Sequence, residues 1–305
     1  MKVGSFCTGY GGLDLAVEQY YNAELSWVSE IDNNCNKILE KRFNKPNLGD
    51  LTSVNWEDVE PVDIICAGFP CQPFSDAGSK KGDKDERAIF PLIAKSIGVL
   101  RPRYVFLENV AGIITTRNGG GLDVVGLLTQ MGYDCRWGII RASDIGACHQ
   151  RARWFCVASD SRSDREGGGQ TGTVREQGNN ERQINEVRPD RSSSLPASDS
   201  TALGQQGVRS ECGLEETERE TRRLSSFRDY EPAIRRWEYV TGRDCPFPTD
   251  DRGLRTEFVE WMMGLEENWV VNQGLSRTAE LKMLGNGVVP QQALLALELL
   301  NERIE

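Results

Sequence analysis

The sequence between residues 2 and 158 alternates short apolar runs with helical stretches, and this alternation constrains the fold more than any other feature. Five runs have the length and apolar character of buried strands, at residues 2–6, 25–29, 62–67, 104–107 and 154–158. Helical patterns separate them, for example at residues 33–43 and 87–100. Strands that alternate with helices form parallel sheets covered on both faces. The pattern therefore predicts an α/β fold with a doubly wound, mostly parallel sheet.

Residues suited to ligand binding stand where four of these strands end, namely Gly9, Glu30, Gly68 and Glu108. Parallel strands end at the same edge of a sheet, and ligands of doubly wound folds bind at that edge. We therefore expect these residues to surround one site. Glu30 is placed where a carboxylate accepts hydrogen bonds from ribose hydroxyls, although a solvated strand-end glutamate is the ordinary alternative.

The turn after the first strand reads Thr8-Gly9-Tyr10-Gly11-Gly12 and leads into a helical pattern. Its glycines let the backbone approach a ligand closely at the N-terminus of that helix, although a plain tight turn would use them too. The turn differs from the dinucleotide pattern G-x-G-x-x-G, because Leu13 and Asp14 follow the last glycine. This difference argues against a NAD-dependent oxidoreductase, which the alternating fold alone would permit.

A cysteine flanked by prolines follows the third strand, in the run Gly68-Phe69-Pro70-Cys71-Gln72-Pro73-Phe74-Ser75. The prolines stiffen the backbone and hold the thiol at one position. Glycines and charges between residues 75 and 87 make the continuation a candidate flap, and its lysines favour the thiolate form of a nearby cysteine. A free cysteine is usually an inert buried side chain. In this setting, however, the sequence favours a nucleophile at Cys71.

An acid and two arginines complete the candidate site. Glu108 ends the fourth strand at the same sheet edge, so its carboxylate can approach Cys71. Arg151 and Arg153 occupy alternate positions before the fifth strand and face one way if that segment is extended. Arg153 is then placed to orient Glu108 and to donate to a substrate carbonyl, and Arg151 to hold a phosphate or the structure; surface charge is the alternative. A single histidine, His149, makes a histidine base a poor candidate.

Composition excludes several classes of protein. Nine cysteines without a C-x-x-C pair and one histidine support neither a disulfide framework nor a metal site. No run approaches the roughly 18 apolar residues of a membrane span, and no signal peptide precedes the first strand, so we expect a cytoplasmic protein without a membrane segment. The net charge of -10 argues against general electrostatic binding to nucleic acid, but it allows a basic cleft on an acidic body.

The composition changes abruptly after residue 159. Residues 160–255 contain 16 arginines, no lysine and 19 acidic residues, with few apolar residues before Phe227. This change predicts a boundary. Guanidinium groups can bond guanine O6 and N7 together, so the segment suits base reading by a narrow arginine-lined strip. The alternative is a partly disordered insertion at residues 160–226, with recognition confined to residues 230–255.

Six motifs occur in an order typical of one family. They are TGYGG (residues 8–12), GFPCQPFS (68–75), ENV (108–110), QRAR (150–153), EFVEWMMG (257–264) and GNGVVPQQA (285–293). With this set the chain resembles the cytosine-C5 DNA methyltransferases, particularly those of phages and prophages, over roughly residues 2–158 and 254–300. The resemblance implies a Rossmann-like, S-adenosylmethionine-dependent catalytic domain at residues 1–159, a smaller target-recognition domain at 160–255 and a return to the catalytic domain at 256–305.

The activity that the resemblance implies is that of a DNA (cytosine-5-)-methyltransferase. A methyl group passes from S-adenosylmethionine, leaving S-adenosylhomocysteine, to C5 of a cytosine flipped out of double-stranded DNA. Cys71 matches the nucleophile that adds to C6, Glu108 the acid that contacts N3 and the amino group, and Arg153 the arginine that binds O2. Arg151 belongs to the same catalytic block. Attack requires a proton shared between Glu108 and N3, which predicts a carboxyl pKa raised by burial and partly opposed by Arg153.

The resemblance also implies residues that bind the cofactor and the base. The cofactor-binding positions are Phe6, Cys7, Gly9, Tyr10, Gly11, Gly12, Glu30 at the ribose, Ile31, Asp50 at the adenine, Leu51, Gly68, Pro70, Phe90, Asn286 and Val288. The substrate-binding positions are Phe69, Gln72, Ser75 and Asn109. The chain departs from the family pattern at Ser5, Phe6 and Cys7, which replace an acid, a leucine and a phenylalanine. It departs again at Ile31, where tryptophan often stacks on adenine, at Cys148, where proline is common, and at Gly287, where serine is frequent.

Two other readings compete with DNA methylation. One is a related methyltransferase that acts on RNA, and the resemblance favours DNA over it. The other is a DNA- or cofactor-binding protein that has lost turnover, which the intact Cys71, Glu108 and Arg153 weigh against. The expected partner is double-stranded DNA, with a cognate restriction endonuclease as a candidate and no metal or membrane. We expect a monomer in the cytoplasm of a bacterial or phage-infected cell.

Overall fold

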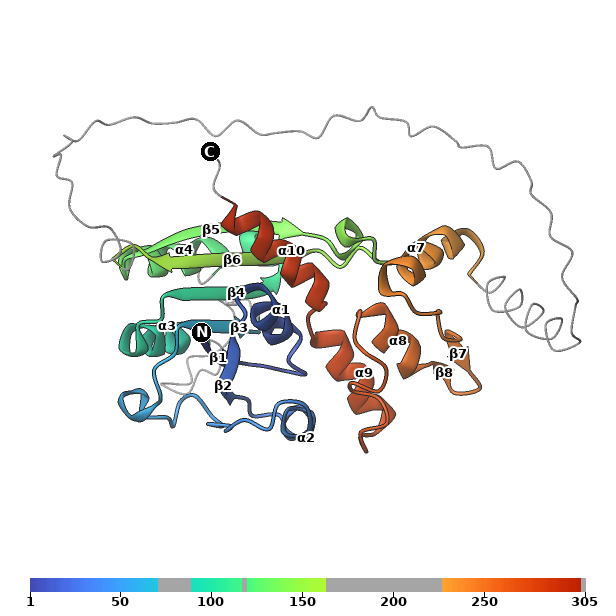
Figure 1. The fold of residues 1–305 in the computed structure, drawn as a ribbon, viewed down its shortest axis with the longest axis horizontal. Coiled ribbons are helices and arrows are strands. Elements are labelled where there is room, and N and C mark those ends of the chain that lie inside the picture. Colours follow the sequence, from blue (N-terminus) through green and yellow to red (C-terminus); the bar gives the residue numbers. More distant parts are fainter. Residues whose placement is uncertain (71–88, 117–119, 163–226, 303–305) are drawn as a thin grey trace, which may run out of the picture.

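A computed structural model describes residues 1–70, 89–116, 120–162 and 227–302 of the chain. Within these residues six strands form one sheet in the order β2-β1-β3-β4-β6-β5 (Figure 1). Their bounds are β1 Lys2–Phe6, β2 Glu24–Ser29, β3 Ile64–Gly68, β4 Tyr104–Val110, β5 Tyr133–Ile140 and β6 Arg153–Asp160. In this sheet β6 runs opposite to the other five strands, and the pairs among β2, β1, β3 and β4 are parallel. The prediction of a mostly parallel sheet is therefore confirmed.

Helices cover both faces of the sheet. The bounds of the described helices, on the sheet and beside it, are α1 Gly12–Tyr21, α2 Asn33–Arg42, α3 Ile89–Leu100, α4 Gly121–Gln130, α7 Glu231–Thr241, α8 Thr256–Met262, α9 Arg277–Asn286 and α10 Pro290–Asn301. Short 3-10 helices span Trp56–Asp58, Ala111–Thr115, Ala142–Ile145 and Arg228–Tyr230. In the described residues no helix combines the length and the apolar character needed to cross a bilayer.

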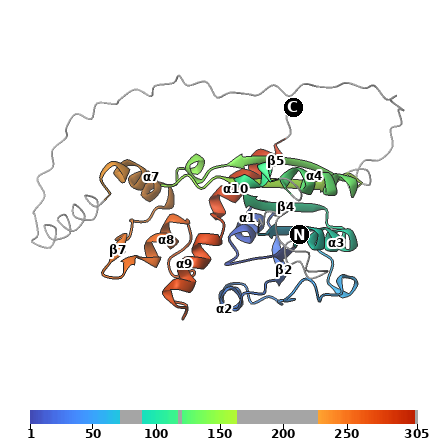
Figure 2. The same cartoon turned by 180° about the vertical axis from the view of Figure 1, so that it is seen from behind.

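The two faces of the sheet bury different residues of each strand, because neighbouring side chains of a strand point to opposite sides. In β3, Ile64 and Cys66 pack in one cluster with α1 and α10. Ile65 and Ala67 pack in the other cluster with α3 and α4. All four side chains are fully buried. Figures 1 and 2 show the two helical layers from opposite sides, so the doubly wound arrangement is also confirmed.

The antiparallel strand β6 and the edge strand β5 bring an arginine to the carboxyl edge of the sheet. Because β6 runs against β4, its first residue, Arg153, lies opposite Val110 at the end of β4. Strand β5 is absent from the sequence-based prediction. Its middle is exposed, including Arg136 and Trp137, and only its ends, Tyr133 and Ile140, are buried. An edge strand of this kind lacks the continuous apolar run that marks the inner strands.

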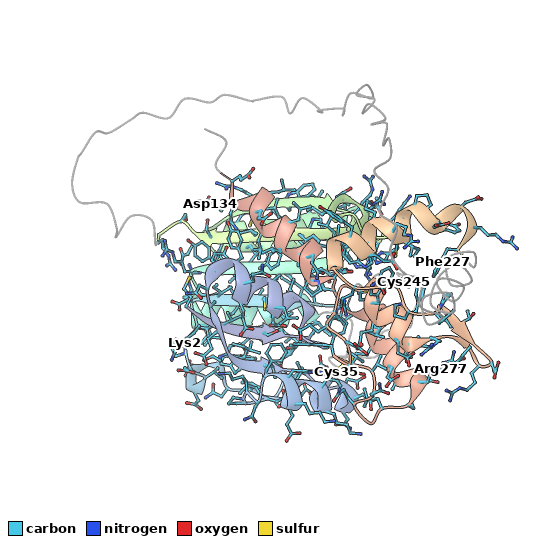
Figure 3. The ribbon with its side chains drawn as sticks, turned by 45° about the vertical axis from the view of Figure 1, so that its right-hand side comes forward. Lys2, Cys35, Asp134, Phe227, Cys245 and Arg277 are labelled. Carbon is cyan, nitrogen blue, oxygen red and sulfur yellow. The ribbon has the colours of Figure 1, made fainter. Side chains whose placement is uncertain are left out.

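A second group of helices, α7, α8 and α9, lies beside the carboxyl edge of the sheet (Figure 1). Their apolar side chains form a cluster of their own that includes Trp237, Trp261 and Met283. The same cluster takes in Cys35 of α2 together with Phe227 (Figure 3), so it joins these helices to the sheet domain. A two-stranded ribbon, β7 Thr249–Asp250 with β8 Gly253–Leu254, precedes α8. The domain boundaries after residues 159 and 255 stay a prediction.

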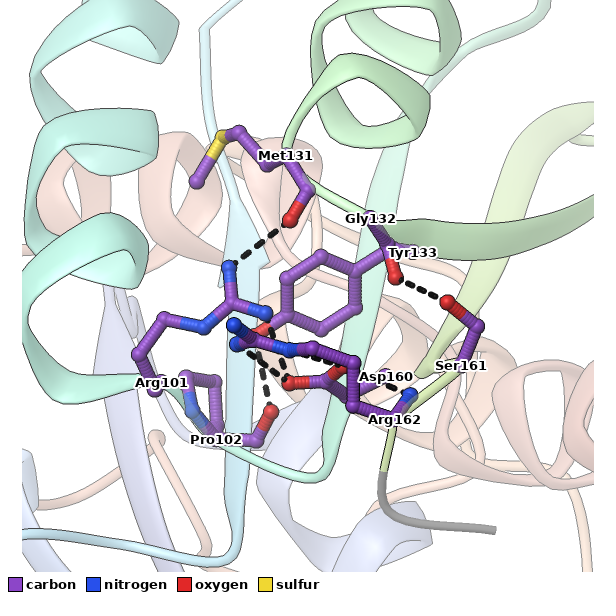
Figure 4. Close-up of polar contacts among 8 residues, drawn as sticks. All are labelled: Arg101, Pro102, Met131, Gly132, Tyr133, Asp160, Ser161 and Arg162. Atoms are coloured by element: carbon purple, nitrogen blue, oxygen red, sulfur yellow. Dashed lines mark hydrogen bonds and ion pairs between the residues drawn. The ribbon is translucent and has the colours of Figure 1, made fainter. Parts of the chain in front are cut away.

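An ion-pair cluster fixes the end of β6, at the edge of the sheet opposite the carboxyl ends (Figure 4). Asp160 accepts hydrogen bonds from Arg101 at 2.6 Å and from Arg162 at 3.1 Å. Arg101 also donates to the carbonyl of Met131 at 2.9 Å and lies over the ring of Tyr133. Burial raises the pKa of Asp160, but the two arginines outweigh it and lower that pKa to about 2. These contacts hold residues 160–162, at the end of β6, in place.

Candidate active site

A cleft of about 600 Å³ opens at the carboxyl edge of the sheet. This size suits a ligand of nucleotide dimensions. It brings together most of the predicted residues. Its wall includes Phe6, Cys7, Gly9, Gly12, Glu30, Gly68, Phe69, Pro70, Glu108, Asn109, Arg153, Asn286 and Val288. Other predicted residues are described but lie off this wall, namely Tyr10, Gly11, Ile31, Asp50, Leu51, Phe90 and Arg151. Cys71, Gln72 and Ser75 lie outside the described residues.

The glycine turn opens the N-terminus of α1 toward the cleft. Gly11 is the N-cap, with a φ of 86° that favours glycine, and no side chain in the described part of the chain caps the helix there. A Cβ at Gly11 would lie 2.4 Å from the ring of Phe43, so the turn also needs glycine for space. The first N–H groups of a helix lack partners within it, and Gly12 and Leu13 line the cleft. This end of α1 therefore suits an acceptor such as a carboxylate.

Glu30 is held at the end of β2 with its carboxylate between two turns. One oxygen accepts the backbone N–H of Gly9 and the other that of Asp32, both at 2.9 Å. The side chain is 9% exposed and lines the cleft. Asp50 is arranged differently, because its carboxylate accepts hydrogen bonds from the backbone and hydroxyl of Thr52, which lower its pKa. Ile31 is 71% exposed. Of these acids and their neighbours, Glu30 is the best placed for ligand hydroxyls.

Glu108 and Arg153 form a buried ion pair in the cleft. The Nε atom of Arg153 lies 2.9 Å from Oε1 of Glu108, whose side chain is 8% exposed. Burial raises the pKa of Glu108 to about 7, against the opposing charges of Arg153 and Arg151. This is the direction and the cause that the sequence analysis expects. A carboxyl with this pKa is partly protonated near neutral pH, so it can serve as a proton donor.

Asn109 and Phe69 shape the loop that leads to the candidate nucleophile. The side-chain amide of Asn109 donates to the carbonyl of Phe69 at 2.8 Å, and its oxygen accepts the N–H of Val110. The ring of Phe69 is buried and packs against Phe90, with ring centroids 5.2 Å apart. These contacts tie the end of β3 to the end of β4. They hold Pro70, directly before Cys71, at the cleft.

Tyr10 supports the far wall of the cleft from behind. Its hydroxyl donates to the carbonyl of Val288 at 2.6 Å, and its ring is 1% exposed. A Cβ at Gly287 would lie 1.9 Å from that ring. This explains why the chain has glycine at a position where serine is frequent in the family it resembles. The indole N–H of Trp269 donates to the carbonyl of Tyr10 at 3.0 Å, which also fastens the turn to the second group of helices.

We expect Gly287→Ala to destabilise the fold, because the added methyl group overlaps the buried ring of Tyr10. Overpacking of this kind costs about 1–3 kcal/mol of unfolding free energy, measured by urea denaturation. Gly285→Ala is the matched control, since no atom of the described residues lies within 4 Å of its added Cβ and the residue is in α9. Alanine there should gain up to about 1 kcal/mol. Equal stability of the two variants would contradict the packing described here.

Several cleft residues escaped the sequence analysis. Asp32 and Lys282 both line the cleft, and their charged atoms lie 3.8 Å apart, between the start of α2 and α9. Nothing in the sequence pairs them, because their contact depends on how α9 packs. Asp14 is fully buried, accepts a hydrogen bond from the thiol of Cys66, and has a pKa raised to about 6 by burial. An acid on the apolar face of a predicted helix was the available signal.

Known proteins are similar to this chain in sequence. A family model for C-5 cytosine-specific DNA methylases matches residues 1–298. The type II methyltransferase M.HhaI of Haemophilus parahaemolyticus is 35% identical over 151 residues, which are 49% of this chain and 46% of that protein. The chain thus spans about half the length of the curated relatives it matches.

Solved structures share the fold. The S. pombe Dnmt2 methyltransferase superposes with a TM-score of 0.60 at 17% identity, covering 99% of this chain and 100% of that one. A mutant of Spodoptera frugiperda DNMT2 gives a TM-score of 0.58 at 15% identity, covering 99% of each chain. At this level of identity the likeness establishes the fold.

Proposed function

Because the chain belongs to the C-5 cytosine-specific DNA methylase family, we propose that it transfers a methyl group from S-adenosylmethionine to C5 of cytosine in double-stranded DNA. The observation that carries this proposal is the buried pair of Glu108 and Arg153, 2.9 Å apart, in the cleft that Pro70 also lines. Cys71 follows Pro70 directly in the sequence. A partly protonated acid, a fixed guanidinium and a thiol are the groups that this chemistry requires.

The cleft fits S-adenosylmethionine. Glu30 offers carboxylate oxygens for the ribose hydroxyls, and the uncapped start of α1, at Gly12 and Leu13, offers N–H groups for the amino-acid carboxylate. Asn286 and Val288 supply the opposite wall. The cofactor supplies the methyl group when bound and leaves as S-adenosylhomocysteine. The other predicted cofactor residues remain part of this proposal, with Tyr10 acting through the turn it supports.

The chain's own residues make C5 of cytosine reactive. The Cys71 thiolate forms a bond to C6, and the electron pair of the C5–C6 double bond shifts toward N3 and O2. Glu108 gives its proton to N3, and Arg153 donates a hydrogen bond to O2, so the developing negative charge is neutralised. C5 then carries the electron density that methyl transfer needs. After the methyl group is bound to C5, a base, with water as the candidate, removes the C5 proton. Its electron pair restores the C5–C6 double bond, the C6–S bond breaks to release the Cys71 thiolate, and N3 returns its proton to Glu108.

Access to the ring requires the base to leave the stack. C5 and C6 lie within the duplex, so we propose that the cytosine is flipped into the cleft. The candidate flap at residues 75–87 lies outside the described residues. Residues 160–255 read the DNA in this proposal. Their described parts are 160–162 and 227–255, and the second carries exposed groups suited to nucleic acid, including Arg228 and Tyr239, which is 89% exposed. Binding that depends on arginine contacts with phosphates should weaken strongly as salt rises.

We propose further that the chain works as a monomer in the cytoplasm of a bacterial or phage-infected cell. The curated relatives are type II methyltransferases, which makes a cognate restriction endonuclease the candidate partner.

Competition with labelled cofactor tests the proposed function. The full chain is incubated with S-adenosylmethionine carrying a labelled methyl group, genomic DNA and tRNA. We expect the label in DNA, in an amount that excess tRNA does not reduce. Label in tRNA alone would contradict the DNA substrate and support the RNA alternative. Binding of S-adenosylhomocysteine without any transfer would instead support a protein that has lost turnover.

A further inference from the structure

We infer that Arg151 is a positioning residue that holds the cofactor-side wall of the cleft, rather than a residue that touches the base. This inference rests on the proposed function. The Nη2 atom of Arg151 donates to the carbonyl of Gly285 at 2.8 Å and to that of Gly287 at 2.5 Å. Both glycines line the cleft, whereas Arg151 lies off its wall. Its guanidinium therefore acts on the site through the turn that ends α9.

The carbonyls that Arg151 binds need a partner from elsewhere in the chain. The last carbonyls of a helix have no N–H partner within it and carry its negative end, which a cation stabilises. Gly285 belongs to the last turn of α9, and Gly287 is its C-cap. No basic residue of α9 lies in its last turn. Arg151 supplies this charge from the loop before β6.

The backbone of Arg151 is also held in an unusual shape. Its φ of 34° lies in the left-handed region, which side-chain-bearing residues rarely adopt. The carbonyl of Arg151 accepts a hydrogen bond from the side-chain amide of Gln292 at 2.9 Å, and the same amide donates to Ile140 at 2.8 Å. Gln292 is fully buried. A strained backbone that its surroundings fix in this way is common where geometry matters for function.

Two neighbouring arginines thus serve two sides of one cleft. Arg153 pairs with Glu108 on the side proposed to bind the base. Arg151, two residues earlier, donates hydrogen bonds to the carbonyls of Gly285 and Gly287 in the opposite wall. Tyr10 holds the next carbonyl of that wall, at Val288. Loss of the Arg151 guanidinium should therefore remove its two hydrogen bonds to this wall, while the ion pair of Arg153 and Glu108 remains. The effect should fall on cofactor affinity.

Three substitutions test this assignment by calorimetric binding of S-adenosylhomocysteine to the full chain. Arg151→Ala removes the guanidinium, and Arg151→Gly removes it while tolerating the positive φ. We expect both to weaken binding about 10- to 100-fold, the scale of losing hydrogen bonds made by a charged group. Arg151→Lys keeps a single charge without the planar fork and should restore part of the affinity. KM of the alanine variant for S-adenosylmethionine should rise by a larger factor than its kcat at saturating cofactor falls.

Arg101→Ala is the matched control. Arg101 also donates to a main-chain carbonyl, that of Met131 (Figure 4), and among the described residues its Nε atom, like that of Arg151, is buried without a partner. It lies at the opposite edge of the sheet. A merely structural role for Arg151 predicts that both alanine variants lower Tm and that neither changes cofactor affinity. The positioning role predicts a loss of affinity in the Arg151 variants only.

The outcomes distinguish a failure of the proposed function from a failure of the positioning role of Arg151. If the unsubstituted chain fails to bind S-adenosylhomocysteine, the proposed function falls. If it binds, and Arg151→Ala and Arg151→Gly bind with unchanged affinity, the positioning role is overturned alone. A fall in kcat at saturating cofactor with unchanged KM would also overturn it, since it would indicate contact with the reacting base. Weaker binding in both glycine and alanine variants, with Arg101→Ala unaffected, supports it.

Discussion

Cys71→Ser is expected to abolish methyl transfer while leaving cofactor binding intact. The serine hydroxyl has nearly the size of the thiol, but at neutral pH it is far less ionised and is a much weaker nucleophile toward C6. Loss of a nucleophile in an enzyme with covalent catalysis costs about 10⁴-fold or more in rate. Cofactor affinity should not change, because the groups proposed to bind the cofactor, such as Glu30 and the start of α1, do not include the thiol.

Methyl incorporation into DNA and calorimetric binding of S-adenosylhomocysteine measure the two properties separately. Cys135→Ser is the matched control, because Cys135 is a free, half-buried cysteine of edge strand β5, away from the cleft. It should retain activity. Normal turnover in Cys71→Ser would refute the nucleophile assignment, and loss of cofactor binding would show that the substitution acts on the fold or on the cofactor site.

Glu108→Gln is expected to lower kcat by about 10²- to 10⁴-fold at pH 7, the usual contribution of a general acid. The amide keeps the shape and can still donate a hydrogen bond, but it cannot give a proton to N3. The pKa of Glu108 is about 7, so the protonated fraction of the unsubstituted chain falls tenfold for each pH unit well above that value. Single-turnover rates of the unsubstituted chain should therefore fall above pH 7, and the rates of the variant should not show this fall. A rate in Glu108→Gln equal to that of the unsubstituted chain would contradict the role.

The raised pKa of Glu108 should also make the unfolding free energy depend on pH. Its pKa rises from 4.5 to about 7 on folding, so the folded state binds the proton more tightly than the unfolded state. Its contribution to stability is full below pH 4.5 and is lost as pH rises through 7, on the order of 3 kcal/mol. The difference between the unfolding free energies of Glu108→Gln and the unsubstituted chain should change over this window. A flat difference would contradict the raised pKa.

The sequence predicted the inner part of the fold well, for a physical reason. Buried strands such as β3, covered on both faces, are continuous apolar runs that stand out between turns. The edge strand β5 and the helix α4 before it did not stand out, because each buries few of its residues. Their place in the sheet depends on pairing with β6, which a local pattern does not reveal.

The candidate site, like the fold, could be predicted from the sequence only in part. Glu30 and Glu108 could be placed from sequence, because residues that follow parallel strands share one edge. Arg153 reaches that edge because β6 is antiparallel, and its pairing with Glu108 at 2.9 Å agrees with the expected orientation. The hydrogen bond from Arg151 to the end of α9 joins residues more than a hundred positions apart. Such contacts come from packing between α9 and the sheet domain, and no spacing in the sequence encodes them.

Bisulfite sequencing of DNA from cells that express the full chain tests the central claim most directly. Unmethylated cytosines are converted by the reagent, and 5-methylcytosines are not. We expect protected cytosines within one recurring sequence context in cells with the unsubstituted chain, and complete conversion in cells with Cys71→Ser. Uniform conversion with a folded, cofactor-binding chain would contradict cytosine-5 methylation of DNA as its activity.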